Sequence, residues 1–276
     1  HQAAMDGRYI AQWDKYSVED AGFVKIDFLA IGALSQMQEA VALIAQRTGK
    51  RVDMSQIDFE DPDVYALMHR ADTIGIFQVE SAAQIQTITR IKPRNLVDMA
   101  FEVAAVRPGV GANDGVSEFI RRRTSGTVHY EHELEVPALQ RTLGVVLFQD
   151  QFNELAIHVA GFTSTEAEEF RRAHGRADEQ EAVLSYWWPK FRDGAQARGA
   201  DERTAARIFG KFNGHYMFPE SHAYAFGVTA YQMAWLKHYY PLEFYIGLFN
   251  EQPMGFYNLE TLKEDARHHD VRVLNP

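Results

Sequence analysis

The most informative segment of this chain is Phe218-Pro-Glu-Ser-His-Ala-Tyr-Ala-Phe226, continued by Tyr231-Gln-Met-Ala-Trp-Leu-Lys-His-Tyr-Tyr-Pro241. The pattern predicts a polar turn at Ser221 and His222, then a helix over residues 222–239 that ends because proline cannot continue it. The first N–H groups of a helix lack partners, so two hydrogen-bonding side chains beside them suit a phosphate. The alternative is that Ser221 is an ordinary N-cap.

The remaining pattern predicts a mainly α protein with a small β element at its start. The strand candidates are residues 8–13 and 22–29; apolar and polar side chains alternate in the second. Thr163 and Glu166 have the spacing of a capping box. We expect further helices over residues 32–49, 62–68, 81–90, 95–105, 114–123, 149–160, 164–174, 179–198, 201–212, 241–250 and 258–268.

Composition limits the class of protein. The 276 residues are 46% hydrophobic and 24% charged, which is an ordinary globular profile. There is no cysteine, which excludes disulfides and thiolate metal sites and fits a reducing cytoplasm. No apolar run approaches the length of a membrane span. We therefore expect a cytoplasmic protein.

The net charge of −10 argues against a nucleic-acid partner, but the charge is unevenly distributed. Arg90 to Gly126 holds seven basic and four acidic residues, whereas Arg51 to Glu80 holds two basic and seven acidic ones. Such asymmetry suits one nucleic-acid face and an acidic back. Arg121, Arg122 and Arg123 are consecutive on a predicted helix and fan out over most of a turn, which favours contact with a phosphate backbone.

Lys25 and Asp27 are two residues apart in the second predicted strand, so their side chains point to one face. A structural ion pair is one interpretation. The alternative is that Asp27 holds Mg²⁺ while Lys25 approaches a phosphate, because hard divalent ions take oxygen ligands. Two-metal phosphoryl transfer needs several carboxylates, and no Asp-x-Asp pair lies on a predicted strand. If Asp27 is a metal ligand, its partner ligands are missing from this chain.

Three further arginines are candidate phosphate ligands. Arg107 immediately precedes a proline, which forces the end of a helix and leaves its side chain projecting. Arg171 and Arg172 lie on the predicted helix over residues 164–174 and could offer two guanidinium forks to a triphosphate. The alternatives are a simple helix stop and a solvated face beside Glu168 and Glu169.

These blocks occur in the same order in one known family. The chain resembles the bacterial C-family DNA polymerases, the alpha subunits of DNA polymerase III, and is most similar to their error-prone, translesion branch. The similar blocks are Gly22-Phe-Val-Lys-Ile-Asp-Phe-Leu29, Thr73-Ile-Gly-Ile-Phe-Gln-Val-Glu-Ser81, Arg107-Pro-Gly109, Phe119-Ile-Arg-Arg-Arg123, Gly144-Val-Val-Leu-Phe-Gln-Asp-Gln151, Phe170-Arg-Arg-Ala-His-Gly175, Ser221-His-Ala223, Tyr231-Gln232 and Trp235-Leu-Lys237. Asn250-Glu-Gln-Pro-Met-Gly-Phe-Tyr257 is similar to the error-prone branch in particular.

The resemblance implies a fragment of a larger DNA polymerase. Residues 1–32 would form the edge of a polymerase-beta-like palm, and residues 33–276 a helical fingers domain. It implies that Asp27 is the third of three catalytic aspartates that hold two Mg²⁺ ions, and that Lys25 approaches the incoming triphosphate. Because the other two aspartates are absent, we expect the isolated chain to be inactive.

The resemblance also implies roles for the fingers residues and a set of partners. Arg171 and Arg172 would bind the triphosphate of the incoming dNTP, and Arg107, Ser221 and His222 would line the same pocket. The implied partners are template-primer DNA and dNTPs, with a sliding clamp and other replication or repair proteins bound through regions outside this chain. The implied location is the bacterial cytoplasm, at the nucleoid.

From the residues alone, two other classes of protein stay open. In a noncatalytic helical DNA-binding module, the arginine segment suffices and Asp27 is structural. In a helical protein–protein scaffold, the arginines are only solvated surface. Nucleotide binding that depends on Mg²⁺ separates a polymerase from the DNA-binding module, and salt-sensitive DNA binding separates that module from the scaffold.

Overall fold

The computed structural model describes residues 13–24, 31–106, 112–176, 180–212 and 217–274. The chain divides into two compact units, residues 1–32 and 33–276. The described residues are mainly helical, as predicted, and their β structure is an isolated parallel bridge between Phe148 and Phe218. Within these same residues, no helix combines the length and apolarity needed to cross a membrane.

The described residues of the first unit include a short helix, α1 (Lys15–Asp20), which the sequence patterns do not predict. The carboxylate of Asp14 caps it by accepting the N–H of Ser17 at 2.7 Å. Trp13 and Phe23 flank the helix and pack edge to face, with ring centroids 5.6 Å apart. A cap and a ring pair, rather than an apolar periodicity, therefore mark this helix.

Most of the two predicted strands lies outside the described residues. Their described parts, Trp13 and residues 22–24, are not in strands. The β element predicted for the start of the chain therefore stays a prediction.

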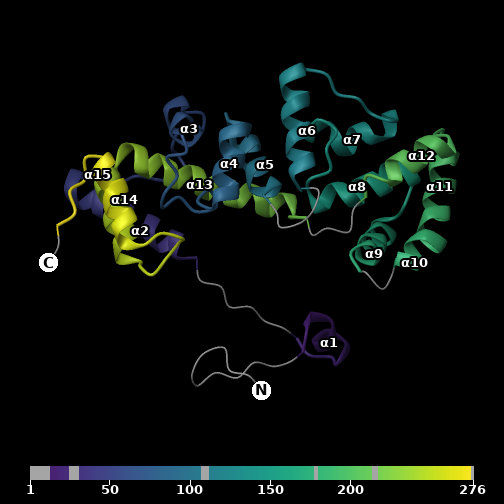
Figure 1. Cartoon of the computed structure of the whole chain (residues 1–276), viewed down its shortest axis with the longest axis horizontal. Coiled ribbons are helices and arrows are strands. Elements are labelled where there is room, and N and C mark those ends of the chain that lie inside the picture. Colours follow the sequence, from purple (N-terminus) through teal and green to yellow (C-terminus); the bar gives the residue numbers. More distant parts are fainter. Residues whose placement is uncertain (1–12, 25–30, 107–111, 177–179, 213–216, 275–276) are drawn as a thin grey trace. The chain divides into compact units, whose positions relative to one another are not determined.

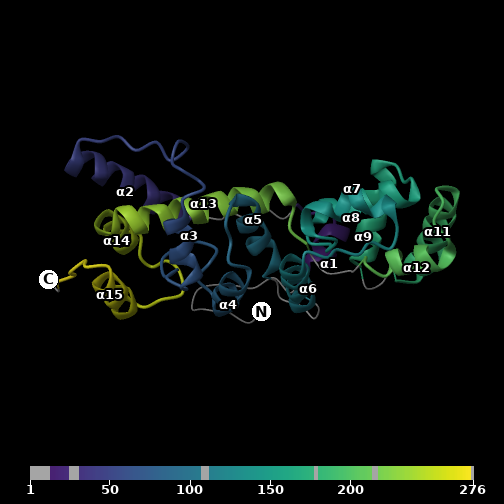
Figure 2. The ribbon, with the colours of Figure 1, turned by 90° about the horizontal axis from the view of Figure 1, so that it is seen from above.

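A long helix, α13 (Glu220–Tyr239), organises one half of the second unit (Figures 1 and 2). It packs against α5 (Leu96–Ala105), α3 (Pro62–His69) and α14 (Pro241–Asn250). Gly227 permits the close approach of α13 to α5, because a Cβ at this position would lie 3.0 Å from the backbone nitrogen of Ala100. The other helices of this half are α2 (Gly32–Thr48), α4 (Ala82–Ile91), α6 (Ala112–Ser125) and α15 (Leu259–His268).

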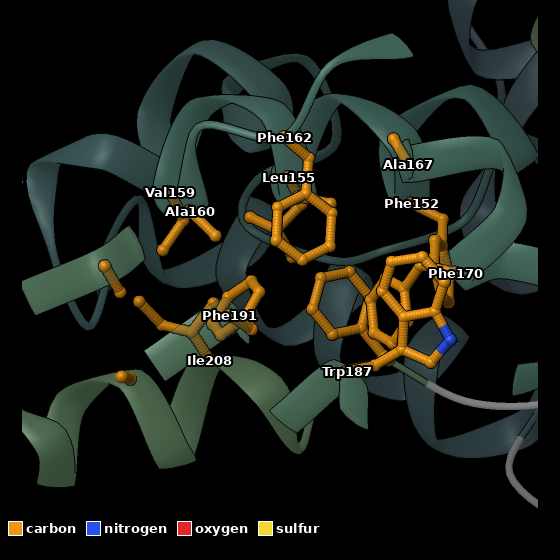
Figure 3. Packing of buried hydrophobic residues seen from close by; sticks show 14 of the residues in the cluster. Phe152, Leu155, Val159, Ala160, Phe162, Ala167, Phe170, Trp187, Phe191 and Ile208 are labelled. Atoms are coloured by element: carbon orange, nitrogen blue, oxygen red, sulfur yellow. The ribbon is translucent and has the colours of Figure 1, made fainter. Parts of the chain in front are cut away.

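The other half of the second unit is built from the residues between α6 and α13. Its helices are α7 (Val136–Leu139), α8 (Gln149–Ala160), α9 (Ser164–His174), α10 (Gln180–Ala182), α11 (Trp188–Ala197) and α12 (Glu202–Phe209). α8 packs against α7, α9 and α11. The rings of Phe152, Phe170 and Phe191 fill the space between these helices (Figure 3). This aromatic core fixes α9 against α8.

Local signals locate most helix boundaries correctly. The helices predicted over residues 149–160, 164–174 and 241–250 coincide with α8, α9 and α14. The predicted capping box at the start of α9 is confirmed, because the Glu166 N–H donates to Thr163 Oγ1 and the Thr163 N–H donates to the Glu166 carboxylate.

Three helical segments between α6 and α13 differ from prediction. The helix predicted over residues 179–198 is interrupted by a π-helix, Val183–Trp187, between α10 and α11. Pro189 follows it and has no N–H to donate, so the regular i→i−4 ladder cannot continue through this turn. The helix predicted over residues 201–212 ends at Phe209. The short α7 and its flanking 3₁₀ turns lack the length that periodicity needs for detection.

Candidate functional site

The predicted site residues fall into those that the structure describes and those that it does not. Lys25, Asp27 and Arg107 lie outside the described residues. The others are on three helices: Arg171 and Arg172 on α9, Ser221 and His222 on α13, and Arg121, Arg122 and Arg123 on α6.

One carboxylate holds both arginines of α9. Glu168 accepts two hydrogen bonds from Arg171, from Nε at 2.9 Å and from Nη2 at 2.7 Å, and one from the Nε of Arg172 at 2.9 Å. Residues three and four apart are neighbours on a helix surface, which allows one side chain to reach both. Asn153 on α8 donates its Nδ2–H to the same carboxylate at 3.3 Å. These contacts form an arginine clip of Glu168, Arg171 and Arg172.

The arginine clip keeps part of its positive charge and part of its hydrogen-bonding capacity. Hydrogen bonds from Arg171 lower the pKa of Glu168 to about 2, against partial burial and with help from Arg172. The ionised carboxylate therefore neutralises one of two guanidinium charges. No other acceptor for either arginine lies among the described residues. The remaining N–H groups can donate to an anion with several oxygens, such as a phosphate.

The start of α13 differs from the prediction. The helix begins at Glu220, and its N-cap is Pro219. The interpretation of Ser221 as an N-cap is therefore wrong; this residue lies in the first turn and is exposed. The backbone N–H of Glu220 donates to Oδ2 of Asp150 at 2.6 Å. A carboxylate of the protein thus already satisfies one N–H group at the helix N-terminus that the sequence suggests for a phosphate.

His222 lies on the exposed side of α13 between two aromatic rings. It stacks on Phe218 with ring centroids 5.2 Å apart, and it contacts Phe226 at 4.0 Å. Phe226 in turn meets Phe77 edge to face at 5.1 Å. The i and i+4 spacing on the helix produces this row. Ring packing therefore fixes the plane of the His222 imidazole beside the loop that carries Phe77.

α8 connects the arginine clip to the start of α13. Asp150, Asn153 and Glu154 share one face of α8, because they are spaced at i, i+3 and i+4. Asp150 binds the α13 backbone, and Asn153 binds the carboxylate of the clip. Glu154 pairs with Nη2 of Arg141 at 2.8 Å, and Arg141 also donates to both carboxylate oxygens of Glu220 at 2.8 and 2.7 Å. In the described residues the two predicted groups are thus joined through α8, not by direct hydrogen bonds.

A buried glutamine shapes the turn that leads into α8. The Oε1 of Gln151 accepts the N–H groups of Leu147 and Phe148 at 2.8 and 3.0 Å, and its Nε2 donates to the Ala138 carbonyl and to Thr142 Oγ1. A buried amide needs such partners, because an unmade hydrogen bond is costly there. Gln151 therefore holds the turn in which Phe148 forms its bridge to the residues before α13.

Two of the three consecutive arginines on α6 have structural partners. Arg122 donates to the carbonyl of Leu143 at 2.6 Å, and Arg123 donates to Asp98 at 2.9 Å. Their side chains are 15% and 24% exposed, whereas that of Arg121 is 65% exposed and, in the part of the chain that the structure describes, pairs only within α6. Arg121 is therefore the member of this triplet best placed to meet an external phosphate.

One group of three potential metal ligands is found among the described residues, and it surrounds a lysine. The ligand atoms of Asp72, Asp265 and His269 lie within 4.8 Å of one another. Nζ of the fully buried Lys237 is 2.8 Å from Asp72 and 2.9 Å from Asp265, and it donates to the carbonyl of Ile74 at 3.0 Å. The ammonium group of Lys237 thus lies among these side chains, where a metal ion would otherwise have to bind. These residues form a buried ionic network that does not fit a magnesium site.

Two further contacts complete the Lys237 network. Burial opposes ionisation of Asp72, yet hydrogen bonds from His269 and Lys237 lower its pKa to about 2. The hydroxyl of Tyr245 donates to Asp265 at 2.6 Å. The network thereby joins α13, α14, α15 and the loop after α3.

The residues that sequence reasoning missed are those partners of the predicted residues that come from other parts of the chain. Glu168 is not one of them, because it precedes its two arginines by three and four positions, and helical spacing already placed it beside them. Asp150, Arg141 and the Lys237 network carried no such signal, because their partners are far away in the chain.

Glu80, in the block that begins at Thr73, is a partly buried carboxyl group. Its Oε1 accepts the N–H of Gly75 at 3.0 Å. Burial raises the pKa of Glu80 to about 7, although the Gly75 N–H and the charge of Lys237 oppose the shift. The folded protein therefore holds this proton over a pH range in which the unfolded chain, with a pKa of about 4.3, has lost it.

This difference predicts a pH-dependent effect of Glu80→Gln. The stabilising contribution of the raised pKa is complete below about pH 4.3 and is lost as the pH rises through about 7. We therefore expect Glu80→Gln to gain stability relative to wild type between about pH 5 and about pH 8. Urea denaturation at several pH values measures the difference, with the exposed Glu260→Gln as control. A difference that is independent of pH would contradict the prediction.

Comparison with known proteins is consistent with the sequence resemblance. The family described as "Bacterial DNA polymerase III alpha subunit finger domain" matches residues 33–199. A protein named "Error-prone DNA polymerase" from Vibrio parahaemolyticus is 42% identical over 277 residues, which cover 99% of this chain and 27% of that protein. Proteins of the same name from Corynebacterium glutamicum and Mycobacterium tuberculosis are 38% and 42% identical over 99% of this chain, and 26% and 25% of their own lengths. The chain thus spans about a quarter of the length of these curated relatives.

Proposed function

Because the chain belongs to the family of the bacterial DNA polymerase III alpha subunit finger domain, we propose that it is the fingers segment of an error-prone, template-directed DNA polymerase. The observation that carries the proposal is the arginine clip on α9, which lies within the matched residues and offers guanidinium N–H groups that have no acceptor among the described residues. The segment would bind the triphosphate of the incoming dNTP while the primer 3′-hydroxyl attacks the α-phosphate. The arginines would neutralise charge that develops on the β- and γ-phosphates.

The remaining roles in this proposal come from the resemblance. Arg107, Ser221 and His222 would line the nucleotide pocket with the clip. The exposed positions of Ser221 and His222 are compatible with contact to a ligand. Asp27 would be a ligand of the Mg²⁺ ions, whose charge supports phosphoryl transfer, and Lys25 would approach the triphosphate. The other metal ligands would come from outside this chain.

The proposed partners are template-primer DNA and dNTPs. Arg121, Arg122 and Arg123 are the proposed DNA contacts, and the exposure of Arg121 makes it the first of them to test. Sliding-clamp and other replication or repair contacts would use regions outside this chain. A polymerase of this kind would act on the chromosome in the bacterial cytoplasm.

The double variant Arg171→Ala/Arg172→Ala of the intact polymerase tests the proposal. A charge-assisted hydrogen bond contributes about 1.5–3 kcal/mol, so losing two should lower kcat/KM for dNTP at least about a hundredfold. Single-nucleotide incorporation with the primer-template saturating measures this effect. Arg267→Ala/Arg272→Ala removes the same charge at exposed positions and should leave kcat/KM unchanged. Equal values for the double variant and wild type would refute the triphosphate role.

A further inference from the structure

We propose that Glu168 is a positioning residue that presents Arg171 and Arg172 to the triphosphate of the incoming nucleotide. The inference rests on the proposed function, because it requires the triphosphate to bind at these two arginines. According to this proposal, the carboxylate of Glu168 strengthens the binding of an anion, although both carry negative charge. The hydrogen bonds of the clip, the exposure of its two arginines and a comparison with a similar group on α6 support this assignment.

The geometry divides the work between the two arginines. Glu168 uses the Nε and Nη2 of Arg171, and this side chain is 25% exposed. It uses only the Nε of Arg172, whose side chain is 73% exposed. With respect to the described residues, Arg171 therefore keeps Nη1 for a ligand, and Arg172 keeps both of its terminal nitrogens. Because Asn153 on α8 also donates to Glu168, the carboxylate is itself held in place.

A second helix carries the same arrangement with a different outcome. On α6, Glu118 accepts hydrogen bonds from Arg121 and Arg122, again at i+3 and i+4. There, Arg122 also donates Nη1 to the carbonyl of Leu143 and is largely buried. The α6 clip thus fastens the helix to a neighbouring turn. The α9 clip has no such backbone acceptor in the described part of the chain, so its free donors point to an external anion.

Glu168 has two opposing effects on a bound triphosphate. Its negative charge repels the phosphates, but water screens this repulsion at a site that is one-third exposed. Its hydrogen bonds also order two arginine side chains before the nucleotide arrives, and arginine loses more rotamer entropy on ordering than most side chains. We expect this ordering to outweigh the screened repulsion, because the hydrogen bonds order both arginine side chains before the nucleotide binds. We therefore expect removal of the carboxylate to weaken nucleotide binding.

The test is steady-state single-nucleotide incorporation by the intact polymerase with dNTP varied. Glu168→Gln keeps the shape of the side chain and should raise KM for dNTP about five- to tenfold, with kcat within about twofold of wild type. Glu169→Gln removes the same charge one position away, where the exposed side chain has no ion pair with a described residue, and should leave KM unchanged. Asn153→Ala removes only the support of Glu168 and should raise KM about twofold.

A double-mutant comparison separates positioning from a general effect on the fold. If Glu168 acts through the clip, Glu168→Gln should have no further effect on KM in the Arg171→Ala/Arg172→Ala background. An effect of equal size in that background would overturn the inference. So would an unchanged or lowered KM for Glu168→Gln alone, provided that the double arginine variant still loses nucleotide efficiency. If the double arginine variant behaves as wild type, the proposed triphosphate role itself fails.

Discussion

Replacing Lys237 with methionine should lower the free energy of unfolding of the chain by about 3–5 kcal/mol. Methionine has a similar length and apolar stem, so the loss reports mainly on the charge. The ammonium group is fully buried, and it compensates the carboxylates of Asp72 and Asp265 at 2.8 and 2.9 Å. Without it, two carboxylates lie close together with little exposure to water, and among the described residues only His269 and Tyr245 still donate to them.

Urea denaturation of the purified variant at neutral pH measures this loss. Lys50→Met is the control, because it removes the same charge from an exposed position and should change stability by no more than about 0.5 kcal/mol. A loss below about 1 kcal/mol for Lys237→Met would show that water or a rearranged side chain replaces the ammonium group. The network would then not hold α13, α14 and α15 together.

Asp27→Asn should remove nearly all nucleotide incorporation by the intact polymerase. Asparagine keeps the size of the side chain but not the charge that a Mg²⁺ ligand provides. Because a metal ion supplies several kcal/mol of transition-state stabilisation, we expect a loss of at least about a thousandfold in kcat. The melting temperature of the variant should stay near that of wild type, since apolar neighbours in the predicted strand face the other way.

The same variant decides against the alternative role of Asp27. If Asp27 only pairs with Lys25 on a solvated surface, the substitution should cost at most about 1 kcal/mol of stability and leave incorporation intact. Thermal unfolding and single-nucleotide incorporation on one preparation distinguish the two outcomes. Asp20→Asn, at an exposed position at the end of α1, is the control and should retain full activity. Retained activity in Asp27→Asn would refute its assignment as a metal ligand.

Helix α8 holds several of the candidate site residues in place. Its face of Asp150, Asn153 and Glu154 contacts the start of α13, the arginine clip and Arg141. Glu220 closes this set through its two hydrogen bonds from Arg141. Two blocks that the resemblance places around one nucleotide are therefore held by a single helix between them.

Local sequence signals were sufficient for the helical class, for most helix boundaries and for the family resemblance. Thr163 and Glu166 marked the start of α9, and α13 ends at Tyr239, the predicted last residue, with Tyr240 between it and Pro241. The same signals located Arg171 and Arg172 on one helix, with Glu168 within reach. Each of these features depends on groups within one or two turns, so a short window of sequence contains its cause.

Whether a candidate side chain is exposed or already paired depended instead on residues far away in the chain. The sequence does not distinguish Arg121 from its neighbours Arg122 and Arg123. In the structure, however, Arg122 donates to the Leu143 carbonyl and Arg123 donates to Asp98, whereas Arg121 is exposed. Lys237 lies in one of the blocks on which the sequence resemblance rests, yet its ammonium group is buried against carboxylates on other elements.

Ser221 and Glu220 illustrate the same limit at the start of α13. The helix begins before Ser221, where the Glu220 N–H meets Asp150, 70 positions earlier in the chain. Glu220 also binds Arg141, 79 positions earlier. Hydrogen bonds and ion pairs act over a few ångströms, so they depend on which distant segments packing brings together. Helix periods and caps involve residues that are close in sequence, whereas these contacts join residues that are distant in sequence.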